Sequence, residues 1–200
     1  MFSLEDLLGQ QQGAEVVGQM SQQVNAEPSL VNTAIQMALP ALINGLANNA
    51  ATPQGAASLD QALTNDHDGS LLDNLGGIAG MILGGGQSSR TTNAGGILGH
   101  ILGGSQGNVT QQISNQSGLN MGQVAQILMI LAPIVMAYLG KQKQQNNLDA
   151  GGLSDLLTGQ QQQIQQAPQG GFLERMLDSD GDGSALDDIA SMAFNYLTKS

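Results

Sequence analysis

The apolar residues of this chain gather into runs that are separated by stretches rich in Gly, Gln and Asn. The most apolar run covers residues 124–139, and its 16 residues include Gln126 and Pro133. A helix that crosses a membrane needs about 20 predominantly apolar residues. The run therefore predicts a buried helix in the core of a folded domain.

Two segments with the same pattern of polar and apolar positions predict two similar helix pairs. Residues 20–46 read MSQQVNAEPSLVNTAIQMALPALINGL, and residues 113–139 read ISNQSGLNMGQVAQILMILAPIVMAYL. Each is a short polar helix, a turn, and an apolar helix with a proline near its middle, where a lost backbone hydrogen bond kinks the helix. We expect an all-α fold with a pseudo-repeat of helix pairs kinked at Pro40 and Pro133. Chance similarity between Ala-, Leu- and Gln-rich helices is the alternative.

Both apolar helices carry start signals at the preceding turn. In the first pair, Asn25 stands before Glu27 and Pro28, and in the second, Asn120 stands three residues before Gln123. Proline is favoured at the first helical position, and Asn followed three residues later by Gln has the spacing of a capping box. These signals support the two helix starts.

Glycines recur every four residues in two aliphatic segments between the helix pairs, residues 71–86 and 94–104. On a helix, such glycines form a smooth strip that lets another backbone approach closely. The apolar stretches hold only about ten residues, too few for the membrane helices in which this spacing is common. We therefore expect soluble helices that support a homo-oligomer or dock a protein partner. The glycines are Gly76, Gly80, Gly84, Gly95, Gly99 and Gly103.

Composition narrows the fold class and the partners. Aromatic residues make up 2% of the chain, which favours helices packed by Leu, Ile, Ala and Met over a sheet. The formal net charge is −11 with 5 Lys and Arg residues, which argues against nucleic acid and against anionic membrane surfaces as partners. Cysteine is missing from the sequence, which removes disulfides, thiol catalysis and thiolate metal sites.

Alternating aspartates near the C-terminus have the spacing of an EF-hand-type calcium loop. Asp178, Asp180 and Asp182 stand at loop positions 1, 3 and 5, a glycine follows at position 6, and Ser184 at position 7 offers its backbone carbonyl. Carboxylates this close together repel one another unless a cation neutralises them. The pattern predicts a calcium ion as the cofactor of this segment.

The end of the loop departs from the EF-hand pattern. Position 12, usually a bidentate Glu, is Ile189, and the nearest acids are Asp187 and Asp188. We expect Asp187, at position 10, to close the site, with Asp188 as the alternative closing ligand, and the whole tail to form a helix-loop-helix. A plain helix start is the competing interpretation, because Ser184 and Asp187 have the spacing of a capping box.

Other candidate chemistry is sparse. Residues 65–74, NDHDGSLLDN, resemble the tail loop faintly, and we interpret them as a capped helix start, with metal binding as the alternative. His100 lies in the apolar string GILGHILGG, which predicts a packed or interface histidine rather than a ligand. Because the sequence carries no nucleophile-elbow, His-x-x-x-His or phosphate-loop motif, we expect a protein that is not an enzyme.

Composition also divides the chain. We expect a helical domain over residues 1–140, a Gln- and Gly-rich linker with one short helix over 141–170, and the calcium-loop tail over 171–200. The opening residues, MFSLEDLLGQ, lack the basic region and apolar run of a signal peptide. This predicts a cytoplasmic location, with release by a non-classical route as the alternative.

Strings over residues 66–80, DHDGSLLDNLGGIAG, and 95–104, GGILGHILGG, followed by an apolar helix with a proline, resemble a bacterial family. This is the domain of unknown function 937, the YidB-like proteins, and the resemblance covers residues 1–140. It implies a small all-α domain and no activity or site residues. With the tail loop, we expect a non-enzymatic calcium-binding structural or protein-interaction protein that self-associates. The alternative is a membrane-active protein that inserts its Gly-rich apolar helices.

Overall fold

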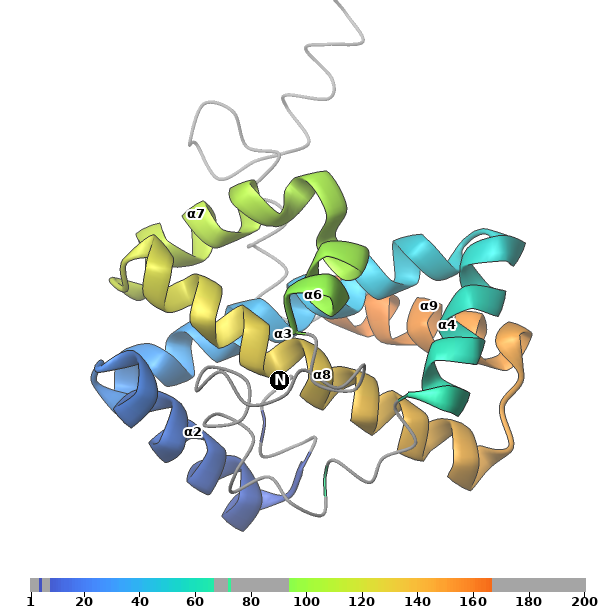
Figure 1. The fold of residues 1–200 in the computed structure, drawn as a ribbon, viewed down its shortest axis with the longest axis horizontal. Coiled ribbons are helices and arrows are strands. Elements are labelled where there is room, and N and C mark those ends of the chain that lie inside the picture. Colours follow the sequence, from blue (N-terminus) through green and yellow to red (C-terminus); the bar gives the residue numbers. More distant parts are fainter. Residues whose placement is uncertain (1–3, 5–7, 67–71, 73–93, 167–200) are drawn as a thin grey trace, which may run out of the picture. The chain divides into compact units, whose positions relative to one another are not determined.

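The computed structural model describes residues 4, 8–66, 72 and 94–166, and among these residues all regular secondary structure is helical (Figure 1). The expected all-α fold class is confirmed. The chain divides into two compact units, residues 1–161 and 162–200, and the packing described below belongs to the first. The elements are α2 (Gln10–Val24), α3 (Pro28–Ala50), α4 (Pro53–Asn65), α6 (Ala94–Leu102), the 3₁₀ helix η3 (Gly103–Ser105), α7 (Gln106–Ser117), α8 (Met121–Asn146) and α9 (Ala150–Gln166).

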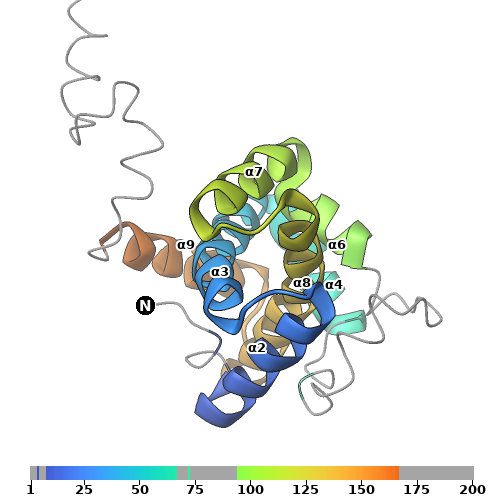
Figure 2. The same ribbon diagram turned by 90° about the vertical axis from the view of Figure 1, so that its left-hand side faces the viewer.

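The core of the first unit is built on α3 and α8, which pack against each other. Figures 1 and 2 show these two long helices together, with α7 on one side and α2 on the other. Both helices bury residues on several faces because other helices cover them, which is why their sequences are apolar nearly all round. Each fully buried Leu or Ile contributes about 1.5–3 kcal/mol. The buried α8 residues include Val124, Ile127, Leu128, Leu131, Ile134 and Val135.

The two helix pairs have matching boundaries. The first helices end at Val24 and Ser117, and the second begin at Pro28 and Met121, so that both boundaries are displaced by 93 positions. Several aligned positions are buried in both pairs, and α3 also packs against α7 while α8 packs against α2, but the pseudo-repeat itself stays a prediction. Pro40 and Pro133 both lie inside their helices, and a kink at either stays a prediction. The aligned buried pairs include Met20 with Ile113, Val31 with Val124, Ile35 with Leu128, Leu42 with Val135 and Leu46 with Leu139.

The predicted capping box at the start of α8 is confirmed. The backbone N–H of Gln123 donates to Asn120 Oδ1 at 3.0 Å, and the backbone N–H of Asn120 donates to Gln123 Oε1 at 3.0 Å. The other half of the same side-chain amide, Nε2 of Gln123, donates to the carbonyl of Val24 at 3.0 Å. One side chain therefore caps the start of α8 and the end of α2.

The start of α3 works differently from the start of α8. Pro28 occupies the first turn, as its sequence position indicates, but the N-cap residue Glu27 makes no side-chain cap hydrogen bond. Asn25 instead ends α2 in the left-handed conformation, with φ 50°, which Asn tolerates better than most residues. Its backbone N–H donates to the carbonyl of Gln22 at 3.4 Å.

Within the expected linker over residues 141–170, the described residues 141–166 are mostly helical. The last turns of α8 extend to Asn146, and α9 occupies much of the rest. Leu153 and Leu157 on α9 are 0% and 1% exposed, and Ser154 Oγ donates to the carbonyl of Ala50 at 3.1 Å. Gln is a good helix former, and two leucines four positions apart are enough to fix a helix on a neighbouring core.

Candidate functional site

The predicted calcium ligands lie outside the described residues. This applies to Asp178, Asp180, Asp182, Ser184, Asp187 and Asp188, and also to most of the weaker segment 65–74. Within the described part of the chain, no group of three or more His, Cys, Asp or Glu side chains could hold a metal ion. The candidate site that the structure offers is a cavity between α3, α4, α6 and α8.

A close crossing of α3 and α6 forms one wall of this cavity. A Cβ atom placed on Gly45 would lie 2.6 Å from the backbone oxygen of Ile101, so the crossing requires glycine there. One turn later, Asn49 Nδ2 donates to the carbonyls of His100 at 2.7 Å and Ile101 at 3.2 Å. These bonds satisfy carbonyls at the end of α6 that have no partner within their own helix. A glycine and an amide on α3 thus fix the position of α6.

A tight turn brings α4 back beside α3. Thr52 is the N-cap of α4, and its Oγ1 accepts a hydrogen bond from the backbone N–H of Gly55 at 3.1 Å. A Cβ on Gly55 would lie 1.8 Å from the backbone oxygen of Asn49. Pro53 suits the first helical position because it has no N–H to satisfy. These residues place α4 along the opposite wall of the cavity.

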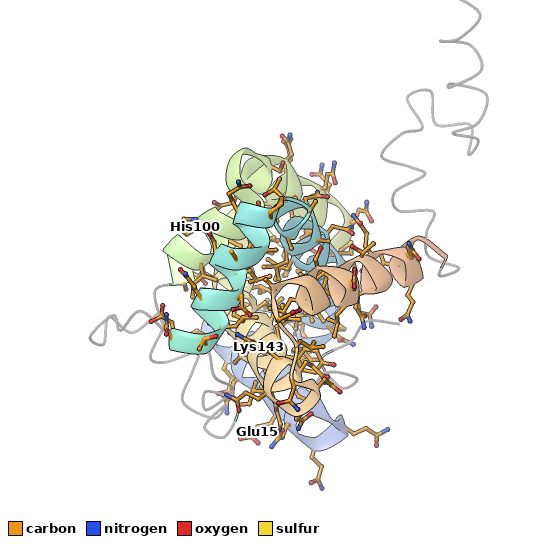
Figure 3. All side chains as sticks on the ribbon, turned by 90° about the vertical axis from the view of Figure 1, so that its right-hand side faces the viewer. Glu15, His100 and Lys143 are labelled. Atoms are coloured by element: carbon orange, nitrogen blue, oxygen red, sulfur yellow. The ribbon has the colours of Figure 1, made fainter. Side chains whose placement is uncertain are left out.

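A lysine fastens the middle of α4 to the end of α8. Lys143 Nζ lies 2.7 Å from Asp60 Oδ1 and donates to the carbonyl of Asp60 at 3.2 Å and to Thr64 Oγ1. The side chains of Lys143 and Asp60 are 18% and 29% exposed. An ion pair in contact with water contributes about 0–1 kcal/mol, so its main effect is to hold α4 in place. Figure 3 shows Lys143 on α8 and His100 on α6.

The cavity has an apolar floor and a polar rim, with a volume of about 570 Å³. Its floor is formed by buried side chains of α3, α4 and α8, namely Leu46, Leu59 and Met136. The side chains of Asn49, Thr52, Ser58 and His100 lie at the exposed rim, and half-buried Asp66 follows the last turn of α4. The remaining described lining residues are Gly55, Ala62, Gly96, Ile97 and Ile101.

The electrostatics of the lining are simple. Asp66 is the one formal charge among the described lining residues at pH 7, and no Lys or Arg accompanies it there. Asp66 is the C-cap of α4, and the C-terminal end of a helix carries a partial negative charge of its own. Small-molecule sites typically have volumes of about 300–1,000 Å³ and an apolar lining with few polar groups. The arrangement can therefore hold an apolar body at the floor and hydrogen-bond it at the rim.

The glycines spaced four residues apart in α6 and η3 face away from the core. A Cβ on Gly95, Gly99 or Gly103 would meet no atom within 4 Å, so these positions do not form the close crossing inside the domain. That crossing is made by Gly45, which the glycine spacing does not reveal. Its signal in the sequence is the pair of uncharged polar dipeptides, Asn44-Gly45 and Asn48-Asn49, that follows the apolar middle of the helix.

Comparison with known proteins gives a family and no further relative. The profile of bacterial proteins of unknown function, DUF937, matches residues 6–142. No curated protein and no solved structure matches the chain. The matched residues include α2, α3, α4, α6 and α7 and all but the last turn of α8, and hence every described residue that lines the cavity. The chain belongs to the DUF937 family of bacterial proteins.

Proposed function

We propose that this protein is a non-enzymatic binding protein whose helical domain holds a ligand with an apolar body in the cavity between α3, α4, α6 and α8. The cavity itself is the observation that carries the proposal. Leu46, Leu59 and Met136 line its floor, and covering apolar surface with a ligand stabilises a complex by about 25 cal/mol per Å². The rim supplies hydroxyl, amide and imidazole groups that can orient such a ligand.

A fluorescent apolar probe tests this proposal in the full chain. N-phenyl-1-naphthylamine is neutral and brightens when it leaves water. We expect it to bind at one site per chain. Ala62→Phe, which fills the cavity from α4, should abolish the signal, whereas Ala57→Phe, on the exposed side of the same helix, should leave it unchanged. Absence of binding, or equal binding by both variants, would refute the proposal.

The tail adds a second, calcium-dependent binding function to the proposal. The alternation of Asp178, Asp180 and Asp182, with Ser184 and an acid at 187 or 188, supports it. Calcium would act there as a structural cofactor that folds the tail, because its ligands repel one another without the ion. Calorimetric titration of the full chain with calcium measures this binding directly. A titration that shows no heat of binding would refute a calcium site in the tail.

Self-association through α6 is also part of the proposal. Gly95 and Gly99 stand on an exposed, uncharged face where a Cβ would meet nothing, so a second copy could approach closely. We expect the mass in solution to exceed that of a monomer. Gly99→Leu should reduce the mass to that of a monomer, and a monomer in both proteins at high concentration would contradict the proposal.

One observation favours membrane activity as the alternative function. α3 and α8 are long and apolar enough to cross a membrane, with mean hydropathy of 1.4 and 1.8 over 18 residues. These windows are 50% and 67% buried in the domain, as expected also for the core helices of a soluble protein. The two helices differ from the Gly-rich segments expected to insert. Dye release from liposomes decides between the functions, because a binding protein should cause none with or without calcium.

A further inference from the structure

We infer that the ligand of the cavity is a cationic amphiphile, an organic amine with an apolar body. This inference rests on the function proposed above and adds the chemical class of the ligand.

The charge of the lining favours a cation over an anion. Asp66 provides a carboxylate at one end of the cavity, and the described lining has no Lys or Arg that could pair with an anionic head group. The end of α4 adds its partial negative charge at the same place. Half-burial of Asp66 lowers the local dielectric, which strengthens the attraction for a cation relative to open water.

The lysine that contacts α4 is already engaged. Lys143 contacts Asp60 and Thr64 on α4, and Asp66 does not take part in that ion pair. The carboxylate of Asp66 is thus left with no described cation within ion-pair distance. An ammonium group of a ligand could pair with the carboxylate of Asp66.

The apolar floor lies at a suitable distance from the carboxylate. Leu59, Ala62 and Asp66 follow one another along the same face of α4, at spacings of three and four residues. At a rise of about 1.5 Å per residue, Leu59 lies roughly 10 Å from Asp66 along the helix axis. An extended alkyl chain of eight carbons has a similar length, so its ammonium can reach Asp66 while its tail covers the floor.

Three ligands of equal chain length test the class. Octylamine, octanol and octanoate are titrated calorimetrically into the full chain at pH 8. We expect octylamine to bind on the order of tenfold more tightly than octanoate, with octanol in between. The difference is modest because a partly exposed ion pair contributes little. Asp66→Asn should remove the preference for octylamine and leave octanol binding unchanged, which also shows that the variant is folded.

The same titrations separate failure of the class from failure of the function. If the neutral naphthylamine probe binds but octanoate equals or exceeds octylamine, the class is wrong and the proposed function stands. If the preference survives Asp66→Asn, Asp66 is not the anionic group and the inference fails. If octylamine still binds to Ala62→Phe, it binds the acidic surface and not the cavity, which also overturns the inference. Failure of the probe to bind at all would overturn function and class together.

Discussion

At the scale of single residues, the domain depends on close approaches that apolar periodicity does not reveal. Gly45 lets the backbone of α6 approach α3 closely, and Asn49 donates hydrogen bonds to two carbonyls near the end of α6. Asn49 lines the cavity and Gly45 precedes the lining residue Leu46, so the position of this cavity wall depends on the crossing. A glycine within a helix costs about 0.5–1 kcal/mol relative to alanine, so the close crossing must offset that cost.

Gly45→Ala should therefore destabilise the protein. In a helix without a packing constraint, the change would stabilise by about 0.5–1 kcal/mol. At position 45 the new Cβ would lie 2.6 Å from the backbone oxygen of Ile101, and the forced shift should cost about 1–3 kcal/mol. Urea denaturation measures the difference.

Gly159→Ala is the matched control for that experiment. Position 159 is an exposed position inside α9, and a Cβ there meets no atom within 4 Å. We expect this variant to gain stability by up to about 1 kcal/mol. Gains of similar size at both positions would show that the α3–α6 crossing is looser than described.

At the scale of elements, side-chain caps connect the two helix pairs. Gln123 completes the capping box of α8 with Asn120 and also donates to the last carbonyl of α2, 99 residues earlier in the chain. Such a bond fixes where one helix begins relative to where another ends. It thereby sets the register between the first pair, α2 and α3, and the second pair, α7 and α8.

Gln123→Ala should cost about 1–2 kcal/mol, because it removes one side of the capping box and the bond to Val24. The loss should appear as a lower urea midpoint with an unchanged slope. Gln111→Ala, at an exposed position of α7, serves as the control and should change stability by only a few tenths of a kcal/mol. Equal effects of the two changes would mean that the connection between the pairs contributes little.

The calcium loop is an element whose folding we expect to depend on its ion. Asp180→Ala should abolish calcium binding in calorimetry, because it removes a central ligand of the loop. Asp187→Ala should weaken binding strongly and Asp188→Ala less, since position 10 is the expected closing ligand. The opposite order would show that Asp188 closes the site. If none of the three substitutions changes calcium binding, the segment is only a capped helix start.

Much of the helical arrangement could be predicted from local signals. Pro28 and the Asn120 capping box mark helix starts that the structure reproduces, and the two aligned segments end and begin at equivalent positions. Residues 141–166 could not be assigned so easily, because their Gln-rich sequence suits a linker as well as a helix. The burial of Leu153 and Leu157 on the core favours the helix. The cavity could not be predicted at all, since it arises where α4 and α6, far apart in sequence, both lie against α3.

At the scale of the whole molecule, the chain divides into two compact units, residues 1–161 and 162–200. The first compact unit extends to residue 161, beyond the DUF937 match, because α9 contributes Leu153 and Leu157 to its core. In this account the cavity belongs to the helical domain, and the calcium loop belongs to the tail. The two proposed binding functions should therefore be separable by truncation.

Ending the chain after Gln169 should leave the helical domain folded. The first unit keeps its whole described core in such a protein, so we expect a cooperative thermal melt with a midpoint within a few degrees of that of the full chain. Ending it after Asn146 provides the contrast, because loss of α9 exposes the surface that Leu153 and Leu157 cover. A loss of cooperativity already in the longer version would place part of the tail in the core.

The central claim, that the cavity between α3, α4, α6 and α8 binds an apolar ligand, is tested most directly by locating the bound probe. Backbone amide shifts of the ¹⁵N-labelled full chain, followed while N-phenyl-1-naphthylamine is added, report which residues it contacts. The account predicts saturable shifts centred on Leu59, Ala62, Ile97 and Ile101, with little change along α2 and α7. Shifts centred on α2 and α7, or a spectrum that the probe leaves unchanged, would contradict it.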